Sequence, residues 1–585
     1  MESFPHSGLE GDISDWELEE GLPQIGDLFI QKYLQGRAAL IEQEKQSRSD
    51  AAFRSSLSAM AAEACAIVSR IRTEERRTIW TQEHEDSSAE EEKGGADGFF
   101  PGMMFSMARE RMETTKLWQI MRKMPKGALL HAHMDAMIDV EWLIDEALRT
   151  EGMSMKANQA LQSSEARERA VVSFKYAESL PSRAPSIWSQ DYQSEQLVSM
   201  KDAAESFPEH GRAGFKAWLR ERSTITSQDS LEHYLGLHEI WQKFVRCFPI
   251  LVSLIFYEPI FRASIRHMLK ELMADGVRWI DFRLAFHFEY RKAGCEDPED
   301  GYEEMFRVFD EEVEKFQRSD DGNGFWGCRF IWTTLRSFGK KEIVESMKNC
   351  ISAKQTYPDL IAGFDLVGQE DIGRPLADLT PELFWFRKRC AEEGLEIPFF
   401  FHAGECLGDG DETDENLFDA ILLGTRRIGH GFSLYKHPLL IEQVKAKSIL
   451  IESCPISNEV LRLTSSILSH PLPALLARGV PCSLSNDDPA ILGHGKNGLT
   501  HDFWQAIQGW ENLGLEGLGS LAENSVRYAA FAPDQTTKEW VRDIKNGLSG
   551  NGIRASRMHE WRTEWNDFCE WIVMEFAADY GSDID

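Results

Sequence analysis

The sequence predicts an α/β fold, namely a (β/α)8 barrel of the TIM type with a helical N-terminal extension and a subdomain inserted after the first strand. Apolar segments of strand length alternate with helix-length segments along most of the chain. Alternation of this kind is typical of parallel sheets, and eight repeats favour a closed barrel over an open sheet. The expected strands are 128–134, 277–286, 327–334, 361–367, 397–401, 427–431, 448–453 and 481–485.

Two regions depart from this alternation. Residues 1–115 carry alanine, leucine and charged residues at helical spacing, and an acidic segment at about 83–98 is expected to be a flexible loop. Residues 116–585 are expected to form the barrel. The connection between the first two strands is much longer than a βα unit requires, so we expect an inserted subdomain at 145–232 within the barrel.

The composition excludes several classes of function. A net charge of −32 argues against nonspecific binding to nucleic acid or to anionic membranes. No apolar run reaches the length of a membrane span, and the first residues do not resemble a secretion signal. The ten cysteines are scattered without a Cys-x-x-Cys pair, which favours reduced thiols. We therefore expect a cytoplasmic protein that acts on a small molecule.

Polar residues follow the expected strands where each strand ends. His131 and His133 stand two positions apart on the first strand, so both side chains point to the same side. Gly368 follows the fourth strand, and His402 and Glu405 follow the fifth. His430 stands at the end of the sixth strand, and Asp487 and Asp488 follow the eighth. Taken singly, each has a structural alternative, such as a packed histidine, a glycine turn or a helix N-cap. Together they lie at the face of a barrel that carries active sites.

These residue types indicate a hydrolytic metal site. Three imidazoles and one carboxylate can hold Zn²⁺ while leaving a position for a water, whose pKa the metal lowers toward neutrality. Glu405 is placed to move the proton of that water to a leaving group, and His430 to orient the attacking hydroxide. The sequence therefore predicts one zinc ion per chain.

Six motifs, in their order along the chain, resemble those of the adenosine deaminase superfamily. They are MPKGALLHAH at 124–133, GFDLVG at 363–368, FHAGE at 401–405, RIGHG at 427–431, CPISN at 454–458 and SNDDP at 485–489. The chain looks most like the adenosine deaminase-related growth factor branch, apparently as an intracellular member. That branch has a dimer-forming helical N-terminal domain and an insert after the first strand, so the resemblance implies a homodimer formed through the N-terminal helices.

The resemblance also implies roles for single residues at the metal. The expected zinc ligands are His131, His133, His402 and Asp487. Glu405 would protonate N1 of a purine and relay the proton of the water, and His430 would hold the hydroxide.

Four further residues would contact the substrate. Asp488 would bond to N7, and the backbone amide of Gly368 would address N3. Asp135 would contact the ribose. Trp241 resembles a tryptophan near the sugar, and a core position is an equal alternative for it.

The reaction implied is the hydrolytic deamination of adenosine or 2′-deoxyadenosine to inosine or 2′-deoxyinosine and ammonia. An alternative keeps this chemistry on AMP, N6-substituted AMP or another 6-substituted purine, with Lys126 and Arg283 as candidate phosphate-binding residues. A third reading is a non-catalytic signalling protein built on the same fold.

Overall fold

The computed structural model describes residues 20–80, 100–180, 185–232 and 236–581, and its centre is a parallel β-sheet in two halves. One half has the order β1-β5-β6-β7, with β1 at Gly127–His133, β5 at Val277–Ala285, β6 at Gly327–Leu335 and β7 at Ile361–Val367. The other has the order β11-β10-β9-β8, with β8 at His402–Ala403, β9 at Arg427–His430, β10 at Leu450–Ser453 and β11 at Cys482–Leu484.

The two halves meet through single bridges. Ala132 of β1 pairs with Asp487, just beyond β11, and Phe364 of β7 pairs with Phe399, just before β8. The strand order therefore follows the ring of a TIM-type barrel, which confirms the predicted fold class, while the hydrogen-bonded ladder is interrupted at these two seams.

The fifth predicted strand, 397–401, differs from the structure. Pro398 has no N–H to donate, so it contributes only its carbonyl, which accepts a bond of 2.9 Å from the Phe364 N–H. The Phe400 N–H in turn donates to the Phe364 carbonyl at 3.0 Å. The segment thus runs beside β7 without a continuous ladder, and regular pairing begins only at His402. The other predicted strands agree with the structure to within about two residues.

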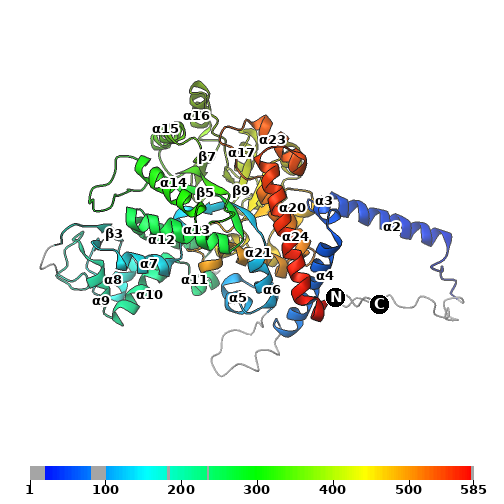
Figure 1. Ribbon diagram of the computed structural model, residues 1–585, viewed down its shortest axis with the longest axis horizontal. Coiled ribbons are helices and arrows are strands. Elements are labelled where there is room, and N and C mark those ends of the chain that lie inside the picture. Colours follow the sequence, from blue (N-terminus) through cyan, green and yellow to red (C-terminus); the bar gives the residue numbers. More distant parts are fainter. Residues whose placement is uncertain (1–19, 81–99, 181–184, 233–235, 582–585) are drawn as a thin grey trace.

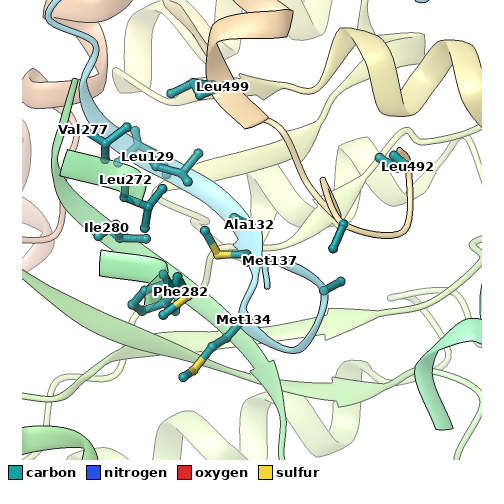
Figure 2. Close-up of a cluster of buried hydrophobic side chains, with 14 of the residues drawn as sticks. Leu129, Ala132, Met134, Met137, Leu272, Val277, Ile280, Phe282, Leu492 and Leu499 are labelled. Carbon is teal, nitrogen blue, oxygen red and sulfur yellow. The ribbon is translucent and has the colours of Figure 1, made fainter. Parts of the chain in front are cut away.

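Helices cover the outside of the barrel (Figure 1). They include α13 (Glu258–Ala274), α14 (Glu303–Gln317), α15 (Lys340–Thr356), α16 (Thr380–Glu392), α17 (Asn416–Leu422), α18 (Pro438–Lys447) and α20 (Leu472–Ala477). The strands turn apolar side chains outward against them. Figure 2 shows Leu129 of β1, Ile280 of β5 and Leu272 of α13 in one such buried cluster.

The long connection between β1 and β5 contains a small antiparallel sheet of its own. Its three strands have the order β3-β2-β4, with β2 at Met153–Ala157, β3 at Val172–Tyr176 and β4 at Val198–Ser199. The helices of this connection are α7 (Val140–Arg149), α8 (Ser164–Arg169), α9 (Met200–Glu205), α10 (Gly211–Ser223), α11 (Ser227–Leu231) and α12 (Gly236–Ile255). The subdomain proposed at 145–232 falls on this segment, which lies to one side of the barrel in Figure 1.

The N-terminal and C-terminal helices pack together. The first helices are α2 (Leu28–Ser47), α3 (Ala51–Ser55), α4 (Ala59–Thr78), α5 (Phe105–Met112) and α6 (Lys116–Lys123). The last are α21 (Gly498–Gly509), α22 (Gly514–Arg527), α23 (Thr537–Asn546) and α24 (Ile553–Tyr580). The α4 helix runs along α24, whereas α2 projects away from the body (Figure 1). The acidic loop predicted at about 83–98 lies outside the described residues. Among the described helices, none combines the length and apolar character that a membrane crossing needs.

Candidate active site

The polar ends of three strands, β1, β8 and β11, converge on one point. Ligand atoms of His131, His133, His402 and Asp487 all lie within 4.8 Å of one another. The Nε2 atoms of His131 and His133 are 3.2 and 3.4 Å from Asp487 Oδ1. Both His131 Nε2 and Asp487 Oδ1 are buried and have no hydrogen-bond partner among the described residues. Buried polar atoms without a hydrogen-bond partner are rare in folded proteins. A cation bound between these two atoms would supply the missing partner, so the residues present fit a metal ion.

Carboxylates behind the histidines set their tautomers. Nδ1 of His131 lies 2.8 Å from Glu452 Oε2, and Nδ1 of His402 lies 2.7 Å from Asp365 Oδ2. Because an ionised carboxylate only accepts hydrogen bonds, each Nδ1 carries the hydrogen and each Nε2 lone pair faces the convergence point. Burial lowers the pKa of His133 to about 3 and that of His402 well below its usual value. The imidazoles of His133 and His402 are therefore neutral, the form that binds metals.

The carboxylates are themselves held by two arginines in the middle of the barrel. Arg283 donates from Nε to Asp365 at 2.9 Å and from Nη2 to Glu452 at 2.8 Å. Arg427 binds Glu452 and donates from Nη1 to Asp281 at 2.7 Å. All five side chains are fully buried. Burial opposes ionisation of Glu452, but Arg283 and Arg427 outweigh it and hold the pKa of this carboxyl well below its usual range.

Glu405 lies beside the convergence point in a different electrostatic setting. Its backbone N–H donates to Glu370 Oε1 at 3.0 Å, while its own Oε1 has no hydrogen-bond partner among the described residues. Burial, followed by the negative charges of Asp487 and Glu370, raises the pKa of Glu405 well above its usual value. The raised pKa favours the protonated form of Glu405, which can give and take back a proton.

A cavity of about 730 Å³ opens above these groups. Every predicted site residue lines it except His131, whose ring lies behind the wall. Asp488 stands beside Asp487, and burial together with the Asp487 charge raises its pKa well above the usual value. The Asp135 carboxyl is also buried, which raises its pKa to about 7. Gly368 follows β7 with a φ of +101°, a backbone conformation that favours glycine.

Part of the cavity wall comes from outside the barrel. Trp241 of α12 lies in it, together with Phe174, Lys175 and Tyr176 of β3. The small antiparallel sheet therefore reaches the space in which a substrate would bind. No pattern in its own sequence indicated this, because the contact depends on the path of the whole β1–β5 connection.

Several functional partners were missed in the sequence. Glu452 could have been found, since an acid inside the apolar run of β10 is a signal in itself. Ser457, whose Oγ donates to Asp487 Oδ2 at 2.7 Å, lies in the α19 helix (Pro455–Val460) within a motif used only for the resemblance. The suggestion that Lys126 or Arg283 binds a phosphate is wrong. Lys126 Nζ donates to the carbonyls of Met121, before β1, and Asp275, before β5. Arg283 is enclosed by the carboxylates described above.

Comparison with known proteins agrees with this arrangement. The family model described as "Adenosine deaminase" matches residues 223–546, more than half of the chain. The chain belongs to the adenosine deaminase family. This member is 31% identical over 454 residues to adenosine deaminase 2-A of Danio rerio, covering 76% of this chain and 83% of that protein. It is 32% identical over 476 residues to adenosine deaminase 2 of Homo sapiens, and the match covers 80% of this chain and 83% of the human protein.

A third relative is adenosine deaminase of Phlebotomus duboscqi, 31% identical over 480 residues, with 79% of this chain and 85% of that protein covered. These matches confirm the resemblance to the superfamily and to its growth-factor-related branch, and they make this family member a hydrolase of the purine deaminase type. Among solved structures, adenine deaminase of Arthrobacter aurescens has a TM-score of 0.43 at 19% identity, covering 73% of this chain and 100% of that one. Similarity at this level does not extend to the substrate.

Gly429 packs closely against the ring of His131, so a substitution at this glycine can test the metal centre. A Cβ on Gly429 would lie 2.7 Å from His131 Cε1 and 3.0 Å from its Nδ1, so Gly429→Ala must displace this ring. We expect the variant to lose bound metal, as measured by elemental analysis of the purified protein. Gly552→Ala is the matched control, because a Cβ there meets nothing within 4 Å. Full metal loading of Gly429→Ala would contradict the placement of His131 at the metal.

Proposed function

We propose that this protein catalyses zinc-dependent hydrolytic deamination of adenosine and 2′-deoxyadenosine, releasing ammonia and leaving inosine or 2′-deoxyinosine. The observation that carries the proposal is the convergence of three imidazoles and Asp487 at a cavity, with Glu405, whose pKa is raised, beside them. The names of the relatives support adenosine as the substrate.

The residues that would hold zinc are His131, His133, His402 and Asp487. When bound there, Zn²⁺ would supply a Lewis acid that brings the pKa of a water near neutrality. The chain itself supplies the remaining chemistry.

Glu405 would act as both acid and base. Its proton would pass to N1 of the purine as the oxygen of water adds to C6, and its carboxylate would then take a proton from that oxygen. Delivery of this proton to the amino group lets the C6–N bond break and ammonia leave, and Glu405 then takes the remaining hydroxyl proton as the C6=O bond forms, which restores its protonated state. Asp488, whose raised pKa favours the protonated form, would donate a hydrogen bond to N7. The reacting carbon would thus lie at the floor of the cavity and the sugar toward its mouth.

Removal of the proton shuttle should separate metal binding from turnover. We expect Glu405→Gln to keep its zinc and to lose about 10²- to 10⁴-fold in kcat, the contribution typical of general acid–base catalysis. Turnover is measured by the loss of adenosine absorbance, and zinc by elemental analysis. Glu412→Gln, the same change at an exposed site in the following loop, is the control. Near-normal turnover in Glu405→Gln would refute the assignment, and an inactive wild-type protein would favour the signalling reading.

A second candidate substrate is a purine nucleotide, and cations at the cavity mouth favour it. Lys156 of β2, Lys175 of β3 and Arg291 line the cavity. Lys156 is paired with Glu195 at 2.6 Å, and Arg291 is paired with Glu289. Lys175 makes no ion pair within the described part of the chain. If the sugar points to the mouth, Lys175 is the cation best able to meet a 5′-phosphate.

Comparison of two substrates tests this alternative. We expect kcat/KM for adenosine to exceed that for AMP, and Lys175→Ala to leave the value for adenosine unchanged, because no phosphate is present to lose a contact. The opposite result, a preference for AMP that disappears in Lys175→Ala, would establish the nucleotide as the substrate.

We also propose that the protein is a homodimer formed through its N-terminal helices. The α2 helix buries none of its residues, and Leu28, Phe29 and Tyr33 on it are 73%, 59% and 67% exposed. Exposed apolar residues gathered on one helix support a contact with another chain.

Deletion of α2 tests the dimer. We expect a chain that begins after Ser47 to have the mass of a monomer by light scattering, because the apolar surface of α2 is then missing. A chain that lacks only residues 1–19 is the control and should remain dimeric. A dimer that survives removal of α2 would contradict the proposal.

A further inference from the structure

A chain of hydrogen bonds runs from the backbone to His430. The Leu472 N–H donates to Nδ1 of His470 at 3.1 Å. Nε2 of His470 lies 3.1 Å from Oδ1 of Asn458, and Nδ2 of Asn458 lies 3.1 Å from Nδ1 of His430. All three side chains are buried. His470 does not line the cavity and lies outside the motifs that carry the resemblance.

The first link fixes the direction of the chain. A backbone N–H can only donate, so Nδ1 of His470 is an acceptor. Burial lowers the pKa of His470 to about 3, so the ring is neutral and its single hydrogen is on Nε2. That hydrogen must be donated to the oxygen of Asn458, which places the amide nitrogen of Asn458 against His430. Nδ1 of His430 therefore accepts a hydrogen bond, and the ring hydrogen of His430 is on Nε2.

Nε2 of His430 points toward the metal site. It lies 3.7 Å from Oδ2 of Asp487, across the space in which an attacking water would stand. A nitrogen that already carries a hydrogen cannot take a proton from that water, but it can donate a hydrogen bond to its oxygen. Resting on the proposed function, we propose that His470 and Asn458 are positioning residues that fix His430 as an Nε2–H donor, leaving Glu405 to accept the proton.

The surroundings keep the chain of bonds in place. The ring of His470 is 5.5 Å from that of Phe432 and 5.8 Å from that of Trp510. The backbone carbonyl of Asn458 accepts bonds of 2.8 and 3.1 Å from the N–H groups of Leu463 and Thr464. His430 has a φ of +60°, which is uncommon for a residue with a side chain. The ring of His470 and the backbone that carries Asn458 and His430 are therefore held in place.

Two substitutions of His470 distinguish positioning from packing. His470→Leu removes the donor, so Asn458 can turn its oxygen to His430 and draw the ring hydrogen to Nδ1. We expect kcat to fall by about tenfold or more, as for loss of a donor to a developing oxyanion, with KM and zinc content close to wild type. His470→Gln retains an N–H that can reach Asn458 and should recover much of this loss. His559→Leu, on the exposed face of α24, is the control.

A second measurement does not depend on activity. In zinc-loaded protein with ring-¹⁵N histidine, the signals of His430 are identified by their loss in His430→Asn. We expect the pattern of a neutral ring with its hydrogen on Nε2 in the wild type, and a shift of the hydrogen to Nδ1 in His470→Leu. An unchanged His430 pattern in His470→Leu, or equal kcat in the Leu and Gln variants, would overturn the inference. Failure of the proposed function would appear separately, as a wild-type protein that does not deaminate adenosine.

Discussion

The active site depends on two arginines buried in the middle of the barrel. Arg283 and Arg427 bind Asp281, Asp365 and Glu452, and these five residues lie on four strands, β5, β7, β9 and β10. Removal of one partner from such a buried group typically costs about 3–5 kcal/mol, because a charge is then left without compensation. The arrangement is therefore held in one geometry. Asp365 and Glu452 in turn each bind a histidine, so the charged centre of the barrel also fixes the imidazoles above it.

Different partners give chemically identical side chains different roles. Carboxylates accept the Nδ1 hydrogens of His131 and His402 and leave their Nε2 atoms free to bind a metal. Nδ1 of His430 instead lies 3.1 Å from an amide nitrogen, with the carboxyl oxygen of Glu405 farther away at 3.6 Å, so its Nε2 carries a hydrogen. The acids divide in the same way, since the arginines lower the pKa of Glu452 while burial and neighbouring acids raise the pKa of Glu405. Environment, rather than residue type, assigns each function.

The sequence predicted the barrel, its strands and the residues at the strand ends, because these follow from local patterns of apolar and polar residues. The partners of those residues were harder to find. His470 and Asn458 act through hydrogen bonds to residues elsewhere in the chain, and no local pattern marks such pairs. The prediction that Arg283 binds a phosphate was wrong for a related reason. Its strand was predicted correctly, but the sequence alone does not show that the side chain enters a closed network rather than the cavity. The cytoplasmic location and the dimer stay predictions.

The origin of the cavity wall has a consequence for how selectivity can change. The groups that would perform the chemistry stand on barrel strands, tied to the charged centre, whereas Phe174, Lys175 and Tyr176 belong to a separate small sheet. Substitutions in that sheet can alter which purine derivative enters without disturbing the imidazoles. The chemistry and the selection of a substrate would thus be carried by separate elements of one chain.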